Sequence, residues 1–453
     1  MACSQLIDAY IEDQMVRQNL PGLSLAVVQQ GDVVFANGYG FANVEGSFPA
    51  TEHTVFEIGS ITKPITATAL MLLVEESKVD LDDPVSNYID PLPTAWTDIR
   101  VRHLLSQTSG IVSYTETANL IDLFRSDCTC EAIIGRVADL PLKFCPGTNW
   151  SYSNTNYYLL GLIIEKAANR PYWDFLDERI FKPSKMIRTM ASSPSASPPN
   201  QASGYSWENN RLEKRDPITP TAGWAAGSLV STASDLANWA IALYSGKLLR
   251  PGSLAQMWTP HKLDNGNDSI YGLGWVVDRF RGYRCVWHNG GTAGFRAVFS
   301  HFPEQQLTVI VLGNQANAAP EAIAKGVAGL HDPALLPPQM IVPQADPNPA
   351  RTETLRQFLL DYAEDNGKDM ALMAPTCIAA TIPEWRRLAA GRVKGIQTFT
   401  FIASDDAREL HEATSRHDVA RCCYYKSVTP QETRFYTFML TADGKVADFY
   451  SDL

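Results

Sequence analysis

A proline-rich stretch divides the chain and limits what either part can fold into. Residues 331–351, HDPALLPPQMIVPQADPNPAR, contain six prolines, and proline can continue neither a helix nor a central strand. We expect an extended linker here. A chain of 453 residues also exceeds what one hydrophobic core usually holds. We therefore predict a domain over residues 1–332, a linker over 333–350 and a smaller domain over 351–453.

Composition excludes several classes of function. The chain is 45% hydrophobic and 19% charged, as in ordinary globular proteins. Its net charge of -11 and the absence of a Lys/Arg run argue against nucleic acid as a partner. No apolar run is long enough to cross a membrane. The N-terminus, MACSQLIDAYIEDQMVRQNLPG, predicts an amphipathic helix and not a signal peptide, so we expect a cytoplasmic protein.

The first domain mixes strands and helices. Two β-rich runs flank Gly31-Asp32 and predict a hairpin, and a helix is expected from Ser60 to about Lys78. Residues 154–169 have helical spacing, whereas the Ser/Pro/Asn-rich residues 190–220 predict a surface loop. Another helix follows in TASDLANWAIALYSGKLL, then a strand meander up to residue 314 and a final helix over 319–330.

The second domain begins with the helix TETLRQFLLDYAED and continues with four β-rich runs, with a turn at Asp443-Gly444. This order predicts a small α+β domain with a mostly antiparallel sheet. The eight cysteines are irregularly spaced and lack a C-x-x-C pattern, so we expect mostly free thiols. No motif indicates a metal or a cofactor.

Ser60 and Lys63 form the only S-x-x-K in the chain. One interpretation is a helix N-cap serine followed by a surface lysine. The other is chemical: residues three apart share a helix face, so a buried, neutral Lys63 can take the Ser60 proton. With Ser60 as N-cap, Pro64 falls at the fourth helical position, where its missing N–H costs nothing.

Two further segments carry residues suited to a catalytic cleft. Tyr152 and Asn154 precede a predicted helix, and Tyr152 could move a proton if a cation such as Lys63 stabilises its phenolate. A later strand ends in His288-Asn289-Gly290-Gly291, whose glycines indicate a close backbone approach. The N–H groups of Ser60 and Gly291 would then bind an oxyanion, with His288 at the cleft edge. Taken singly, each segment is also compatible with ordinary packing.

Together, these segments resemble the serine β-lactamase and penicillin-binding-protein superfamily, in particular its class C-type branch of esterases, DD-peptidases, D-amino-acid amidases and transesterases. The resemblance spans residues 5 to about 330. It implies a β-lactamase-like α/β fold, an antiparallel sheet flanked by helices plus a helical lobe, with the active site between them. It also implies Ser60 as nucleophile, Lys63 as base, Tyr152 as general acid/base and Asn154 as a substrate-orienting amide.

The chain departs from the β-lactamase pattern at one position. His288-Asn289-Gly290 replaces Lys-Thr-Gly, and neutral histidine grips a substrate carboxylate poorly. Trp150, Trp224, Phe295 and Tyr157 lie near the motifs, and would make the cleft aromatic if they line it. Core packing is the alternative for each.

The predicted function is a serine hydrolase or acyltransferase that forms a Ser60 acyl-enzyme from a small, apolar or aromatic ester or amide. Water, an alcohol or an amine would accept the acyl group. The alternatives are a transesterase or other tailoring enzyme of secondary metabolism, a β-lactamase or DD-peptidase, and a non-catalytic binding protein on this fold. A homo-oligomer is a further expectation.

Overall fold

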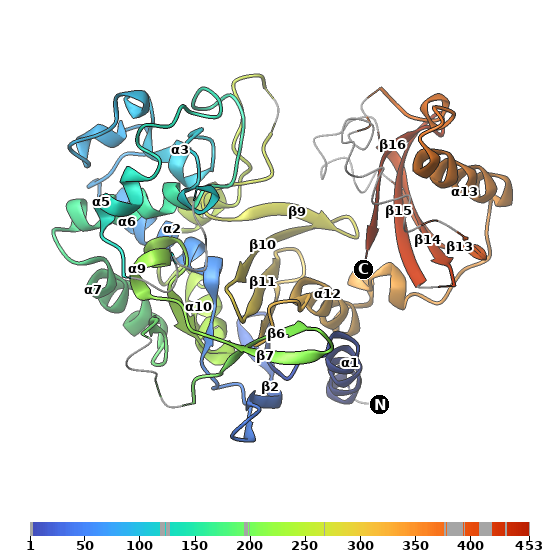
Figure 1. Cartoon of the computed structure of the whole chain (residues 1–453), viewed down its shortest axis with the longest axis horizontal. Coiled ribbons are helices and arrows are strands. Elements are labelled where there is room, and N and C mark those ends of the chain that lie inside the picture. Colours follow the sequence, from blue (N-terminus) through green and yellow to red (C-terminus); the bar gives the residue numbers. More distant parts are fainter. Residues whose placement is uncertain are drawn as a thin grey trace. The chain divides into compact units, whose positions relative to one another are not determined.

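The computed structural model describes residues 3–117, 123, 127–193, 198, 200–266, 268–375, 377, 393, 395–406, 419–430 and 433–452 (Figure 1). The chain divides into two compact units. The first comprises Met1–Asp278 and Arg284–His331, and the second comprises Arg279–Tyr283 and Asp332–Leu453. The proline-rich stretch is not extended throughout, because it forms the short 3₁₀ turns Pro333–Leu335 and Pro338–Met340.

A seven-stranded sheet forms the centre of the first unit, and all its described pairings are antiparallel. Its strands, in spatial order, are β3 (Phe48–Pro49), β2 (Asp32–Asn43), β1 (Gly22–Gln29), β12 (Leu307–Gly313), β11 (Arg296–Phe302), β10 (Tyr283–Gly291) and β9 (Val276–Phe280). Gln29 pairs with Asp32, so Gln30 and Gly31, both with positive φ, form the two-residue turn that the sequence predicts.

Helices cover this sheet. Every residue of β12 is buried. Because side chains alternate along a strand, Ile310 and Leu312 join the core cluster that contains α10 (Ala233–Tyr244), while Val309 and Val311 point to the opposite face. The helix α12 (Pro320–His331) packs on β11 and β12, and α1 (Cys3–Gln18) packs on α12. Buried side chains therefore pack against helices on both faces of the sheet.

A helical lobe adjoins the sheet and shares its core cluster (Figure 1). In it, α2 (Thr62–Glu75) packs against α6 (Asn154–Ala168), and α6 also contacts α3 (Val101–Leu105). Further helices among the described residues of this unit are α5 (Cys130–Gly135), α7 (Tyr172–Leu176), α8 (Lys182–Ser184), α9 (Pro220–Gly223) and α11 (Pro251–Met257). Apolar residues cover most of α2, and all but its last two residues are buried.

The predicted loop over residues 190–220 is wrong in part. A short strand, β5 (Met190–Ala191), joins β4 (Phe56–Glu57) and β8 (Leu229–Ser231) in a three-stranded sheet. A hairpin of β6 (Gly204–Glu208) and β7 (Arg211–Arg215) follows. Asn209 and Asn210 both have positive φ, so two asparagines make a turn that the polar composition concealed. Residues 194–197 and 199 of that predicted loop lie outside the described residues.

In its described residues, the second unit combines a four-stranded antiparallel sheet with a long helix, as predicted. Its strands run in chain order: β13 (Thr398–Asp406), β14 (Val419–Val428), β15 (Thr433–Thr441) and β16 (Val446–Asp452). The helix α13 (Pro349–Glu364) begins at Asn348, whose side chain accepts a hydrogen bond from the Arg351 N–H. Phe358 and Leu359 of α13 pack on aromatic residues of the sheet, which gives this unit its own core.

Candidate active site

Ser60 lies in a tight turn between β4 and α2. Residues Gly59–Ile61 form a 3₁₀ turn, and α2 begins at Thr62 with Ile61 as its N-cap. The prediction that Ser60 caps the helix is therefore wrong, and Pro64 stands at the third helical position. Lys63 is nevertheless helical, although a residue before proline usually avoids this conformation. Because Ser60 lies in the 3₁₀ turn and is not the N-cap, its hydroxyl is free to contact Lys63 and does not cap the helix.

Lys63 is fully buried and makes three short polar contacts. Its Nζ lies 2.9 Å from Ser60 Oγ, 2.8 Å from Asn154 Oδ1 and 2.7 Å from the carbonyl oxygen of Ala226. Burial lowers the pKa of Lys63 well below its usual value, and no carboxylate forms an ion pair with it in the described ranges. A neutral amine has two N–H groups and one lone pair. Because the Asn154 and Ala226 oxygens can only accept, they take both N–H groups, and the lone pair faces the Ser60 O–H.

Tyr152 lies beside this pair. Lys63 Nζ lies 4.7 Å from the centroid of the Tyr152 ring. Burial raises the pKa of the Tyr152 phenol above its usual value, and an interaction with the Ser60 hydroxyl opposes this shift only in part. The site therefore combines an amine whose pKa burial lowers with a protonated phenol, and not the phenolate that the sequence suggested.

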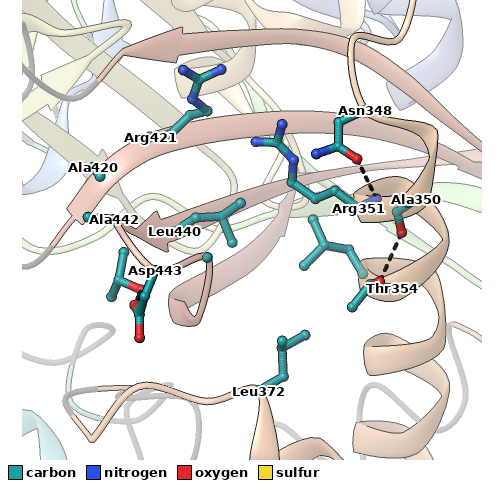
Figure 2. Close-up of a pocket in the computed structure, with 13 residues that line it drawn as sticks. Asn348, Ala350, Arg351, Thr354, Leu372, Ala420, Arg421, Leu440, Ala442 and Asp443 are labelled. Atoms are coloured by element: carbon teal, nitrogen blue, oxygen red, sulfur yellow. Dashed lines mark hydrogen bonds between the residues drawn. The ribbon is translucent and has the colours of Figure 1, made fainter.

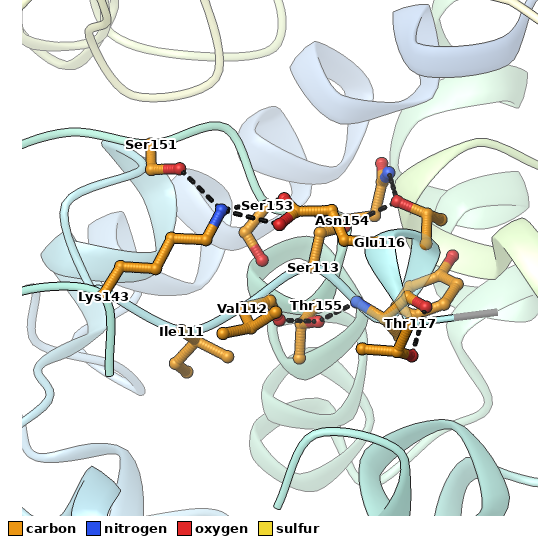
Figure 3. Close-up of polar contacts among 12 residues, drawn as sticks. Ile111, Val112, Ser113, Glu116, Thr117, Lys143, Ser151, Ser153, Asn154 and Thr155 are labelled. Carbon is orange, nitrogen blue, oxygen red and sulfur yellow. Dashed lines mark hydrogen bonds and ion pairs between the residues drawn. The ribbon is translucent and has the colours of Figure 1, made fainter. Parts of the chain in front are cut away.

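Asn154 is held in place by a hydrogen-bonded loop (Figure 3). Its Nδ2 donates to Thr115 Oγ1 at 3.1 Å, and its backbone N–H donates to Ser113 Oγ at 3.1 Å. The two hydroxyls are themselves 2.7 Å apart. Thr155 adds a hydrogen bond from its hydroxyl to the carbonyl of Val112. These contacts fix the amide so that its oxygen, and not its nitrogen, faces Lys63.

The outer end of the same loop is joined to the segment before α6. Glu116 forms an ion pair of 2.8 Å with Lys143, and Lys143 also donates to Ser151 Oγ at 3.3 Å (Figure 3). The pair is exposed, so its contribution to stability is small. Its geometric effect is to hold the loop close to Tyr152 and Asn154.

The two glycines at the end of β10 touch the nucleophile segment. A Cβ on Gly290 would lie under 3.0 Å from the Ile58 carbonyl oxygen, and one on Gly59 would lie 2.7 Å from the Gly291 nitrogen. Neither backbone could yield to a side chain here. Gly59 also has a φ of +49°, which few side chains tolerate. The glycines that the sequence singled out thus bring the Gly291 backbone next to Ser60, as two oxyanion donors require.

His288 is buried behind this edge, and its predicted place at the cleft edge is wrong. Its Nδ1 lies 2.6 Å from the Asn289 carbonyl, so Nδ1 carries the proton and Nε2 accepts from the Tyr271 hydroxyl at 2.9 Å. Burial is the main cause that lowers the pKa of His288 to about 3. The imidazole is therefore neutral at physiological pH. Asn289 turns away from Ser60 and donates to Glu321.

A cavity of about 570 Å³ opens onto Ser60, and Asn154 and Gly291 also line it. Among its other described lining residues are Tyr114, Ser206, Arg215, Ile218, Thr292 and Arg296. Among the described residues of this lining, Tyr114 is the single aromatic one, so the predicted aromatic cleft is wrong for them. Trp224 and Tyr157 belong to the core, Phe295 is buried against Phe56, and the half-exposed Trp150 lies outside the lining. The cavity wall is made mostly of small residues, with polar side chains among them.

Several residues of the site escaped the sequence analysis. The Ala226 carbonyl reaches Lys63 because Trp224, with φ of 35°, turns the chain sharply just before it. A backbone carbonyl leaves no residue-type signal. Tyr271 and Tyr114 lie far from the motifs in sequence, and Glu57 resembles any strand-edge acid. Only the S-x-x-K, Y-x-N and glycine patterns had a recognisable spacing.

A second, larger cavity of about 850 Å³ lies within the second unit, between α13 and the sheet (Figure 2). Arg351 of α13 and Arg421 of β14 line it together with Asn348, Thr354 and Asp443 (Figure 2). Its described lining residues include no nucleophile paired with a base, so the Ser60 cavity is the candidate active site. Within the described ranges, no group of three or more His, Cys, Asp or Glu side chains is placed to hold a metal ion. In the same residues, no helix is long and apolar enough to cross a membrane.

In this fold a serine at the cavity lies 2.9 Å from a buried lysine. Residues 7–331 match the sequence profile of the Beta-lactamase family. The chain therefore belongs to this family, whose superfamily members are serine hydrolases, and the predicted β-lactamase-like fold is confirmed.

Three similar proteins illustrate the range of the family. Penicillin-binding protein 4* of Bacillus subtilis is 29% identical over 314 residues, which cover 64% of this chain and 68% of that protein. The octameric penicillin-binding protein homologue from Pyrococcus abyssi is 25% identical with a TM-score of 0.66, over 98% of this chain and 95% of that one. A D-amino acid amidase from Ochrobactrum anthropi is 26% identical with a TM-score of 0.63, over 74% of this chain and 98% of its own.

Proposed function

We propose that this chain hydrolyses or transfers the acyl group of a small ester or amide through an acyl-enzyme at Ser60. The observation that carries the proposal is the buried Lys63 amine, 2.9 Å from Ser60 Oγ with two fixed acceptors on its N–H groups. A serine beside a neutral, oriented base is an activated nucleophile.

In the acylation step, Lys63 Nζ takes the proton of Ser60 while Oγ attacks the substrate carbonyl. The backbone N–H groups of Ser60 and Gly291 stabilise the negative charge that develops on the carbonyl oxygen, a contribution often worth about 3 kcal/mol per donor. The bond to the leaving alcohol or amine then breaks. Tyr152, a protonated phenol next to Lys63, supplies the proton that this leaving group needs and recovers it through Lys63.

Deacylation reverses these roles. Water, or an acceptor alcohol or amine in the same cavity, loses its proton to Lys63 and attacks the acyl carbonyl, and Lys63 returns this proton to Ser60 Oγ as the bond between Oγ and the acyl carbon breaks. His288 contacts Tyr271 and not Ser60, so it holds the aromatic wall behind Tyr152 and is not a proton donor to the substrate. Asn154 orients Lys63 and is also exposed to the substrate cavity.

The cavity suggests the size and polarity of the substrate. Its volume of about 570 Å³ is that of a small-metabolite site, and its lining of mostly small residues, with Tyr114 as the one aromatic side chain among the described ones, gives no specific support for aromatic acyl groups. The similarity to a D-amino acid amidase makes amides of amino acids the first substrates to test. Acyl transfer to an alcohol, as in a tailoring transesterase, uses the same acyl-enzyme and differs only in the acceptor.

One observation favours a second candidate, a peptidase or β-lactamase activity on carboxylate-bearing substrates. Arg296 lines the cavity, and its Nη1 donates only to the carbonyl oxygens of Thr292 and Phe295. No ion pair to a carboxylate engages it in the described ranges. Its guanidinium could therefore hold a substrate carboxylate that the neutral His288 cannot. The similarity to penicillin-binding protein 4* agrees with this candidate.

A cytoplasmic location and self-association remain part of the proposal. The octameric homologue from Pyrococcus abyssi aligns with nearly the whole chain, so a multimer is the first assembly to look for by light scattering.

The proposal is tested by hydrolysis of short p-nitrophenyl esters and amino-acid amides by the full chain. We expect turnover in the wild type, none in Ser60→Ala, and a loss of at least about 100-fold in Lys63→Met, as for removal of a general base. Ser253→Ala, whose hydroxyl contacts Glu75 on the far end of α2, is the matched serine control and should retain full activity. Turnover that survives in Ser60→Ala would rule out the acyl-enzyme, and a non-catalytic binding protein would show no turnover at all.

A further inference from the structure

Glu57 is a buried acid that the proposed reaction does not use. It lies on β4, three residues before Ser60, and its side chain is 2% exposed. In the sheet it stands opposite Val230 of β8. A buried carboxyl is costly unless its oxygens find donors, so its partners indicate why the chain retains it.

The first partner is the backbone of the cavity wall. Ile218 donates its N–H to Glu57 Oε1 at 3.1 Å. Asp216, Pro217 and Ile218 all line the cavity that opens onto Ser60. Pro217 has no N–H to donate. The hydrogen bond from Ile218 therefore connects this part of the cavity wall to β4, the strand that precedes Ser60.

The second partner is Thr292, the residue after the proposed oxyanion donor Gly291. Its side chain lies near enough to the carboxyl to lower the pKa of Glu57 in opposition to burial. The contact is looser than a hydrogen bond of normal geometry, so the buried hydroxyl has no close partner among the residues that the structure describes. Thr292 also lines the catalytic cavity. Glu57 thus faces both sides of the site.

Charged groups surround Glu57 without neutralising it. Lys214 and Arg215 of β7 line a cavity of about 650 Å³ that Glu57 also lines. Three further charged residues are close in sequence to Glu57 or to one of its two partners, Ile218 and Thr292. They are Lys63, Asp216 and Arg296. None of them forms an ion pair with Glu57 in the described part of the chain. Burial therefore dominates, and it raises the pKa of Glu57 to about 7.

We propose that Glu57 is a positioning residue for the reaction at Ser60, because its carboxyl holds the Ile218 wall and the Thr292 side chain against the nucleophile strand. The inference rests on the proposed function and adds a residue to it. The carboxyl accepts from Ile218 in both protonation states. The ionised form can only accept, and it places a negative charge beside the site where an oxyanion must develop.

The kinetic consequence is a limit on the alkaline side of the pH profile. We expect kcat/KM of the wild type to fall above pH of about 7 as Glu57 ionises. Glu57→Gln keeps the acceptor for Ile218 and donates an N–H to Thr292, so it should retain the rate at pH 6 and lose this fall. Glu57→Ala leaves the Ile218 N–H without its acceptor, and KM should rise about tenfold at every pH. An unchanged alkaline limb in Glu57→Gln, or an unchanged KM in Glu57→Ala, would overturn the proposal.

A control variant separates this effect from the general removal of a buried acid. Asp235 on α10 is also buried and accepts hydrogen bonds from the Arg188 N–H and the Thr189 hydroxyl, away from the cavity lining. Asp235→Asn should keep the alkaline limb of the wild type. Loss of the limb in this control as well would count against a specific role for Glu57.

A measurement without turnover tests the positioning itself. In Ser60→Ala protein, the amide resonances of Ile218, Gly291 and Thr292 should shift together with a midpoint near pH 7, and should not shift in Ser60→Ala/Glu57→Gln. If these amides do not titrate, the inference fails whatever the activity. If they titrate as expected but the wild type shows no Ser60-dependent turnover, the proposed function fails and the positioning role of Glu57 in the cavity stands.

Discussion

The neutrality of Lys63 can be tested by changing its neighbour Asn154 to aspartate. Asn154 Oδ1 lies 2.8 Å from Lys63 Nζ, and the amide is almost the same size and shape as a carboxylate. The change therefore adds one negative charge at hydrogen-bond distance from the amine and leaves the volume unaltered. Thr115, which now accepts from Nδ2, can rotate its hydroxyl and donate to the new oxygen.

The expected effect follows from the electrostatics of a buried amine. An opposite charge within about 4–6 Å shifts a pKa by roughly 1–3 units in favour of the charged form. Burial alone now holds the pKa of Lys63 low, so Asn154→Asp should raise it by that amount. Because only the neutral amine can accept the Ser60 proton, kcat/KM at pH 7 should fall, by at most about 1,000-fold for a shift of three units. The rate should recover as the pH rises through the new pKa.

The assay is kcat/KM for a p-nitrophenyl ester between pH 5 and pH 10, with Asn154→Leu as the uncharged control. The leucine variant loses a hydrogen bond but adds no charge, so its acid limb should stay where the wild type has it while its rate falls at every pH. Asn154→Asp should instead move the acid limb upward. An unmoved limb in Asn154→Asp would refute a neutral Lys63 as the base.

Two further predictions concern packing and pH. Gly290→Ala should abolish activity and lower the free energy of unfolding by about 1–3 kcal/mol in urea titrations, because its Cβ would collide with the Ile58 carbonyl. The control is Gly252→Ala on α11, where no atom lies within 4 Å of the added Cβ. This variant should retain both the activity and the stability. His301 is buried with its pKa lowered to about 3, so below pH 6.5 the unfolded chain binds a proton that the native state refuses. The free energy of unfolding should fall by up to about 1.4 kcal/mol per pH unit between pH 6.5 and pH 3. The fall should be less steep in His301→Phe than in the exposed control His53→Gln. Equal slopes in the two variants would contradict His301 as the origin.

The parts of the fold that could be predicted are those with a local signal. The Gly31 hairpin, the helix after Ser60 and the strands of the second unit follow from periodicity and turn residues. The β6–β7 hairpin did not, because its Asn209-Asn210 turn and charged strands resemble a polar loop. Its place in the fold depends on pairing between its two strands and on contacts made after folding.

The site shows the same division. Spacing along one helix turn was enough to bring Ser60 and Lys63 together, and two glycines indicated the close approach of β10. Which carbonyl accepts from Lys63, where His288 points and which aromatic residues line the cavity are decided by segments far apart in sequence. Trp224 and Phe295 lie next to motif residues along the chain, yet their side chains belong to the core. Proximity in sequence predicted their position poorly.

The central claim is that Ser60 becomes acylated because Lys63 is its base. Intact-protein mass spectrometry after brief mixing with a p-nitrophenyl ester tests it directly. The wild type should gain the mass of one acyl group, on a peptide that contains Ser60. Asn154→Asp should gain this mass more slowly than the wild type at pH 7, and at the wild-type rate at higher pH. Ser60→Ala should gain no acyl group. Acylation at another residue, or acylation of Ser60 at the same rate in Lys63→Met, would contradict the account.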